Sequence, residues 1–240
     1  MIGLGTIVNT AAIVAGGVIG LLGGRRLSGR YQQTIIMGLG MSVMFVGIAG
    51  TLKEMLKVDG SGALHSHGAL MLVVSIALGA VLGELADIES KFEAFGEWIR
   101  RKVHSEGDDK FVEAFVTTSL TFCIGAMAIV GSIQDGLAGD ATVLYLKSVM
   151  DGVFTVVMAA SLGKGAIFAA VPILLYQGSI TLAARFISPA FTPAAMSNLS
   201  YVGNLLIFAV GWNIVHGEKK VRVANLLPSL AIAYVWSFFA

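Results

Sequence analysis

Long apolar stretches, each close to the thickness of a bilayer, alternate with short polar segments along the chain. A helix needs roughly 20 mostly apolar residues to cross a membrane. The predicted spans are residues 4–22, 34–56, 68–85, 111–133, 143–162, 165–187, 194–215 and 223–239. The pattern therefore predicts an all-α fold, a polytopic membrane helical bundle with about eight transmembrane helices.

Residues 88–103 have a different pattern. Ile88, Phe95 and Ile99 fall on one helical face, charged side chains cover the other faces, and Trp98 adds an interfacial aromatic ring. This arrangement is typical of an amphipathic helix that lies on the membrane surface. A helix that binds a soluble partner is the alternative.

The order of the spans predicts a single integral membrane domain over residues 1–240 with an internal repeat. Short stretches of the third and sixth spans align, for example Gly68-Ala69 with Gly165-Ala166. The predicted organisation is a first three-helix repeat (1–86), an amphipathic cytoplasmic segment (87–110), a second three-helix repeat (111–190) and two C-terminal helices (191–240). Copies of three spans insert with opposite orientation, and such inverted repeats recur in secondary transporters. A purely compositional similarity is the alternative.

The distribution of basic residues predicts the orientation. If the N-terminus lies outside, most of the 16 Lys and Arg residues fall on the cytoplasmic side, among them the clusters Arg25-Arg26 and Lys219-Lys220. Cytoplasmic loops carry an excess of Lys and Arg. We therefore expect both termini outside the cytoplasm and the amphipathic helix on the cytoplasmic face.

The composition agrees with a membrane protein. Of the 240 residues 56% are hydrophobic and 13% are charged, about half the charged share of a soluble domain, and the mean hydropathy is +0.82. The net charge of +1, without a basic cluster, argues against nucleic acid as a partner. The single cysteine, Cys123, excludes an intrachain disulfide. We expect His65 and His67 in a solvated loop, with neither a metal nor a cofactor.

Glycine spacing predicts close helix packing. The chain has 30 glycines, a larger share than the usual value of about 7%. Gly16 and Gly20, and likewise Gly79 and Gly83, are four residues apart and form smooth strips against which a second helix can pack. Asn9 in the first span is expected to form an interhelical hydrogen bond rather than to bind a ligand.

Ionisable and amide residues gather where the fourth, fifth and sixth predicted spans follow one another. Lys147 and Asp151 are four residues apart and share one helical face. Ionisable residues at membrane depth usually face a bundle interior or a water-filled path. The candidate substrate- or ion-binding residues are Gln134, Asp135, Lys147, Asp151, Gln177 and Asn204. Alternatively, the Lys147–Asp151 pair only neutralises itself and Asp135 only caps a turn.

Four segments carry a family resemblance: GAMAIVGSIQDGL, LKSVMDG, VPILLYQGSITLAA and VANLLPSLAIA. Together they resemble the YqgA/YdfK-type family of uncharacterised multi-pass bacterial inner-membrane proteins, over essentially the whole chain. The resemblance implies a location in the bacterial plasma membrane and, at most, transport. It implies no substrate and no catalytic residue.

Three classes of function compete. The favoured one is a membrane transporter, an ion-coupled carrier of a small solute or ion through the polar site between the fourth, fifth and sixth helices. An ion channel would use the same groups as a continuous lining, and a non-transporting scaffold or assembly protein would use them for packing. An enzyme is disfavoured because no nucleophile–base pair or Gly-rich phosphate loop is evident. The expected partners are the lipid bilayer and a small solute or ion, and a homo-oligomer stays open.

Overall fold

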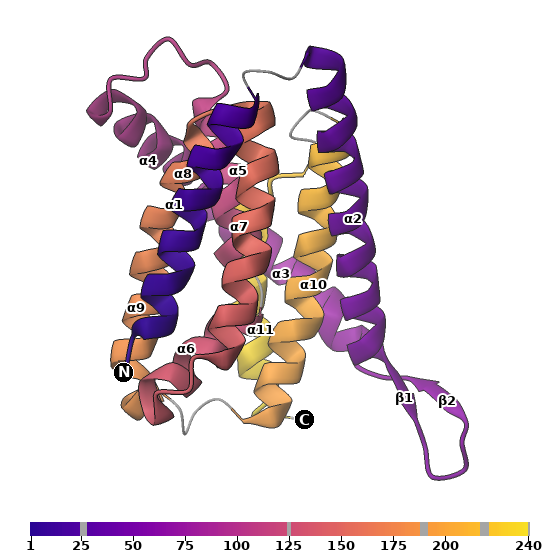
Figure 1. Cartoon of the computed structure of the whole chain (residues 1–240). Helices are drawn as coiled ribbons and strands as arrows, with labels where there is room; N and C mark the ends of the chain where they lie inside the picture. The colour runs from indigo at the N-terminus through magenta and orange to yellow at the C-terminus, as the bar shows by residue number, and fades with distance from the viewer. Residues whose placement is uncertain (25–27, 124–125, 188–191, 217–220, 240) are drawn as a thin grey trace. The chain divides into compact units, whose positions relative to one another are not determined.

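The computed structural model describes residues 1–24, 28–123, 126–187, 192–216 and 221–239. These residues are almost entirely helical, with one short β-hairpin (Figure 1). The all-α fold is thus confirmed. The clusters Arg25-Arg26 and Lys219-Lys220, on which the expected orientation depends, lie outside the described residues.

The chain forms two compact units. Unit 1 comprises Met1–Leu39, Lys91–Cys123 and Met127–Ala190, and unit 2 comprises Gly40–Ser90, Ile124–Ala126 and Phe191–Ala240. The boundaries of these units differ from those of the expected segments 1–86 and 111–190. The reason is that the first helix packs mainly on helices from the second half of the chain. The expected inverted repeat stays a prediction.

Most of unit 1 consists of helices from the middle of the chain. They are α1 (Leu4–Gly24), α4 (Ile88–Lys102, from Lys91 onward), α5 (Phe111–Cys123), α6 (Ala126–Ala138), α7 (Thr142–Leu162), α8 (Gly165–Phe168) and α9 (Ala170–Ile187). Helix α1 runs alongside α7 and also contacts α9 (Figure 1). The contact is close because a Cβ atom at Gly16 would lie 2.3 Å from Gly152 O, and one at Gly20 would lie 2.2 Å from Val156 O. Only glycine leaves room for backbones at such distances.

The fourth predicted span is bent rather than straight. The expected helix over residues 111–133 is divided into α5 and α6, which differ in direction by 61°. The sixth predicted span, 165–187, is divided at Ala169 into α8 and α9. Pro172 lacks a backbone N–H, so the Phe168 carbonyl loses its helical donor. At the break itself Ala169 N donates to Ala166 O, three residues earlier, at 3.3 Å.

The amphipathic segment is a helix, as its pattern predicted, and α4 packs on α5. The ring of Phe95 meets that of Phe115 edge-on, with centroids 5.8 Å apart, and Ile99 is buried. Arg100 pairs with Glu97 at 3.0 Å. The apolar face of α4 therefore covers helices of unit 1, while Trp98 stays half exposed.

Unit 2 contains the remaining elements. They are α2 (Gly29–Met55, from Gly40 onward), β1 (Leu56–Val58), β2 (Leu64–Ser66), α3 (Ala69–Ala86), α10 (Pro193–His216), η2 (Val223–Leu226) and α11 (Pro228–Trp236). Helix α3 uses its two glycines for close approach. A Cβ atom at Gly79 would lie 2.5 Å from Ser229 N, and one at Gly83 would lie 1.7 Å from Asn225 O.

The segment expected as a loop with two histidines is an exposed antiparallel hairpin beyond the end of α2 (Figure 1). At its turn the Asp59 carboxylate accepts hydrogen bonds from the Ser61 hydroxyl (2.6 Å), Ser61 N (2.8 Å) and Ala63 N (3.0 Å). His65 Nε2 lies 2.8 Å from the same carboxylate. The Ser61 hydroxyl first, then Ala63 N and His65, lower the pKa of Asp59 from 3.8 to about 2.

Six helices in the described part of the chain are long and apolar enough to cross a membrane, or up to seven if the bent pair α5–α6 counts as one span. The expected count of eight is not confirmed. The eighth stretch, predicted over 223–239, is a shorter apolar helical segment, Val223–Trp236, with a 3-10 turn before Pro228. Pro228 starts a new helix at N1 or N2 rather than continuing one.

Candidate functional site

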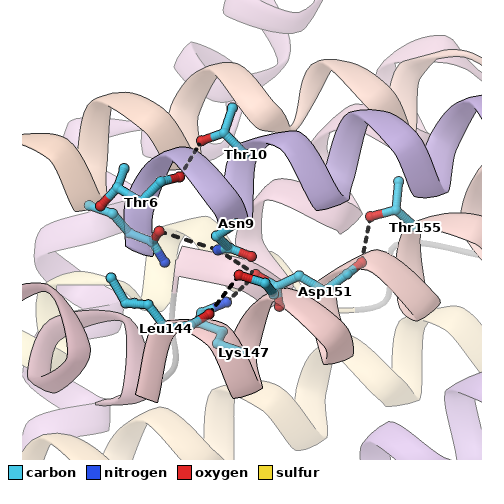
Figure 2. A network of polar contacts seen from close by, with 9 residues as sticks. Thr6, Asn9, Thr10, Leu144, Lys147, Asp151 and Thr155 are labelled. Carbon is cyan, nitrogen blue, oxygen red and sulfur yellow. Dashed lines mark hydrogen bonds and ion pairs between the residues drawn. The ribbon is translucent and has the colours of Figure 1, made fainter. Parts of the chain in front are cut away.

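A buried ion pair on α7 forms the centre of the candidate site in unit 1. Lys147 and Asp151 lie one helical turn apart, and the Lys147 ammonium bonds Asp151 Oδ2. Their residues are only 5% and 6% exposed. Figure 2 shows both side chains directed towards α1. The helix periodicity that the sequence indicated therefore brings these two groups together.

Helix α1 supplies the second contact to this carboxylate. Asn9 Nδ2 donates to Asp151 Oδ2 at 3.0 Å and to Gln177 Oε1 of α9 at 3.2 Å (Figure 2). The network fixes the orientation of the Asn9 amide, because the opposite orientation would place its oxygen against a carboxylate oxygen. One amide group thus links α1, α7 and α9.

Apolar side chains also line the pair. Leu144 is fully buried one turn before Lys147 on α7. The Lys147 ammonium lies 5.2 Å from the ring centroid of Phe122, within the range of a cation–π interaction. Two charges removed from water at this depth are costly unless each is paired and hydrogen-bonded.

Two atoms of the network have no partner among the described residues. Asn9 Oδ1 and Gln177 Nε2 are buried and make no hydrogen bond. A buried polar group without a partner costs about 1–3 kcal/mol. The network therefore retains one acceptor and one donor that are free to bind a further group.

A second polar layer lies one turn towards the start of α1. Asp135 of α6 is fully buried, and its Oδ2 accepts a hydrogen bond from Gly5 N at 3.1 Å. The Thr6 and Thr181 hydroxyl oxygens lie 3.4 Å apart. Asp135 therefore meets the positive end of α1 rather than only capping its own turn.

The remaining predicted site residues lie elsewhere. Gln134 is exposed although Asp135 is buried, because neighbouring helical residues point about 100° apart. Asn204 belongs to unit 2, where its amide donates to Ser200 O at 2.7 Å. Of the six candidates, Lys147, Asp151 and Gln177 are joined through Asn9 in one network.

Several polar residues of the site carried no functional expectation. Asn9 was expected to pack helices rather than to bind a ligand, and Thr6 was not singled out, yet both are buried in unit 1. The available signal was the spacing of Thr6 and Asn9, three residues apart on one face of an otherwise apolar helix. Among the described residues, no three His, Cys, Asp or Glu side chains are grouped to hold a metal.

Comparisons with known proteins agree with the membrane architecture. A family model described as "Protein of unknown function (DUF554)" matches residues 4–238. The chain is 31% identical over 234 residues to the "Uncharacterized membrane protein YdfK" of Bacillus subtilis (strain 168), covering 98% of this chain and 95% of YdfK. It is 29% identical over 237 residues to the "Uncharacterized protein YqgA" of Escherichia coli (strain K12), covering 96% and 94%. No solved structure matches the chain.

These similarities confirm the resemblance that the four sequence segments indicated. The helices long enough to cross a bilayer and the membrane relative agree that the chain is a multi-pass membrane protein. The match of the family model over nearly the whole chain shows that the protein belongs to the DUF554 family.

Proposed function

We propose that the protein is an ion-coupled transporter of the bacterial plasma membrane, a carrier of a small solute or ion, with both termini outside the cytoplasm. The observation that carries this proposal is the Asp151 carboxylate, buried in an apolar span and held by Lys147 of its own helix and Asn9 of another. Ionisable groups in this setting mark ion pathways and proton relays. In the proposed cycle Asp151 alternates between Lys147 and a proton or cation.

The contact between α1 and α7 supports movement of the site. Gly16 and Gly20 present no side chains to α7, so the backbones of the two helices meet closely at these positions. Small sliding of packed helices is one of the movements by which proteins close around ligands. Such a slide would separate Asn9 from Asp151 and change the environment of the carboxylate.

Substitution of Asp151 by asparagine tests this proposal because it keeps the shape and removes the charge. The purified variant is assayed twice, for thermal unfolding in detergent and for charge movement in liposomes on a solid-supported membrane after proton and sodium concentration jumps. Asp109→Asn is the matched control, the same chemical change on an exposed residue of the same unit. Transport predicts a stable Asp151→Asn protein without currents and a control with wild-type currents.

A packing role predicts a different pair of results. Removing one partner of a buried ion pair leaves the other uncompensated, which costs about 3–5 kcal/mol. An unstable Asp151→Asn variant would therefore favour the scaffold function. A stable variant with wild-type currents would eliminate Asp151 as the coupling residue. A wild-type protein without current under either gradient would refute ion coupling itself.

A further inference from the structure

Asp135 forms no ion pair with Lys147, the cation that is buried in the same unit. The residue is fully buried in α6, its Oδ2 accepts one backbone N–H from Gly5, and its Oδ1 has no hydrogen-bond partner. The only described lysine buried in unit 1, Lys147, is paired with Asp151. Lys147 is thus not available to Asp135, and a carboxylate buried among apolar helices is unfavourable unless a cation or a proton binds it.

Further oxygen atoms lie in the same layer as this carboxylate. Ser132 is one turn before Asp135 on α6, fully buried, and its hydroxyl has no partner. Thr6 follows Gly5, whose N–H bonds Asp135, and the Thr6 hydroxyl faces that of Thr181. Helix α9 reaches this layer closely, since a Cβ atom at Gly136 would lie 2.3 Å from Thr181 O. Three helices therefore contribute one carboxylate and three hydroxyls to this layer.

The spacing of the two threonine hydroxyls suits ligands of an ion. Their 3.4 Å separation is longer than the roughly 2.7–2.8 Å of an ordinary O–H···O hydrogen bond. Two oxygens that bind one ion at a right angle, with bonds of about 2.4 Å as for calcium and ions of its size, are also about 3.4 Å apart.

We propose that Asp135, Ser132, Thr6 and Thr181 form a sodium-binding site, and that sodium is the coupling ion of the transporter proposed above, on which this inference rests. A single carboxylate with neutral hydroxyls matches one positive charge, whereas protein sites for divalent ions usually carry more carboxylates. The 3.4 Å separation of the two threonine oxygens fits metal–oxygen bonds of about 2.4 Å and so favours sodium over a larger cation such as potassium. Thr6 and Thr181 lie one helical turn from Asn9 and Gln177, respectively. A sodium ion at Asp135 would therefore alter the hydrogen bonds around Asp151.

Sodium binding can be measured without transport. The melting temperature of the purified wild-type protein in detergent is compared in sodium chloride, potassium chloride and choline chloride at equal ionic strength. A ligand that binds only the folded state raises the melting temperature with the logarithm of its concentration. We expect such a rise for sodium and none for choline, with potassium far weaker.

Two variants assign the response to this layer. Asp135→Asn is expected to lose the sodium-dependent rise, and Asp109→Asn, the exposed control, is expected to keep it. Thr181→Val removes one hydroxyl at nearly constant shape and is expected to weaken sodium binding roughly tenfold. If Asp135→Asn does not fold, Thr181→Val and the ion series on the wild type still test the site.

The contrary outcomes are distinct. An equal rise in all three salts, or a sodium response retained by Asp135→Asn, would overturn the site. A stability that responds to pH and not to sodium would identify a proton at Asp135 and also overturn the sodium assignment. If the sodium response is absent, proton-driven currents that depend on Asp151 would still support the transporter. If all currents are absent, a sodium-dependent melting temperature would still support the binding site. The two proposals can therefore fail separately.

Discussion

The close approach of α1 to α7 can be tested by adding one methyl group at Gly20. A Cβ atom there would lie 2.2 Å from the carbonyl oxygen of Val156 and 3.0 Å from the Cβ atom of Ala159. Ordinary van der Waals contact begins at 3.4 Å, so the two backbones would have to separate locally by about 1 Å. The obstacle is backbone rather than the end of a flexible side chain, so no rotamer change relieves it.

The cost of Gly20→Ala follows from this geometry. Overpacking of a well-packed interior costs about 1–3 kcal/mol, whereas alanine gains about 1 kcal/mol over glycine in a helix. Gly23→Ala on the same helix shares that gain, and its Cβ atom would meet nothing within 4 Å. The difference between the two variants therefore isolates packing, and we expect Gly20→Ala to be less stable than Gly23→Ala by about 1–3 kcal/mol.

Unfolding of both variants in mixed micelles, titrated with a denaturing detergent and followed by circular dichroism, measures this difference. Equal stabilities of Gly20→Ala and Gly23→Ala would refute the close-packing argument, because the methyl group would then be accommodated without cost. Sodium or proton currents of the Gly20→Ala protein test in addition whether sliding along the strip is part of the cycle.

Two further predictions concern charges. If Asp151→Asn is unstable, as a packing role predicts, the double variant Lys147→Met/Asp151→Asn is expected to be more stable, because no buried charge is then left unpaired. Equal instability of both variants would show that the ion pair is not the cause. In the hairpin, the carboxyl carbon signal of Asp59 should titrate near pH 2, below its ordinary 3.8. The stabilisation of the hairpin by the Asp59 carboxylate should be complete above pH 4 and lost as the pH falls towards 2. A titration midpoint near the ordinary pKa of 3.8 would contradict the hydrogen bonds at the turn.

Much of the helical architecture could be predicted because the bilayer demands long apolar segments. The span predicted over 143–162 corresponds to α7 (Thr142–Leu162). The bend between α5 and α6 could not be predicted, since apolar residues continue across it and hydropathy carries no information on the direction of a helix axis. The hairpin was missed because its two strands have only three residues each and are stabilised by the Asp59 turn rather than by a buried face.

The site was partly predictable for a related reason. Helical periodicity within one segment correctly paired Lys147 with Asp151, but it cannot say which other helix faces them. Asn9 is far from them in sequence, and a lone amide in a membrane helix usually serves packing. Gln134 was grouped with Asp135 by proximity in sequence, although the two side chains point about 100° apart on α6 and only Asp135 is buried.

The arrangement around Asp151 also bears on the interpretation of the ion pair as purely structural. A pair that only neutralises itself on one helix needs no third partner, and apolar residues around it would suffice. Here Asn9 reaches the same carboxylate oxygen as Lys147 and is held in turn by Gln177, so three helices depend on the charge state of one side chain. Protonation or cation binding at Asp151 would weaken the bonds from both donors at once, and α1 and α7 would lose their polar link while keeping a smooth glycine contact. A change in charge can thereby become a movement of helices, which is the coupling that a carrier requires.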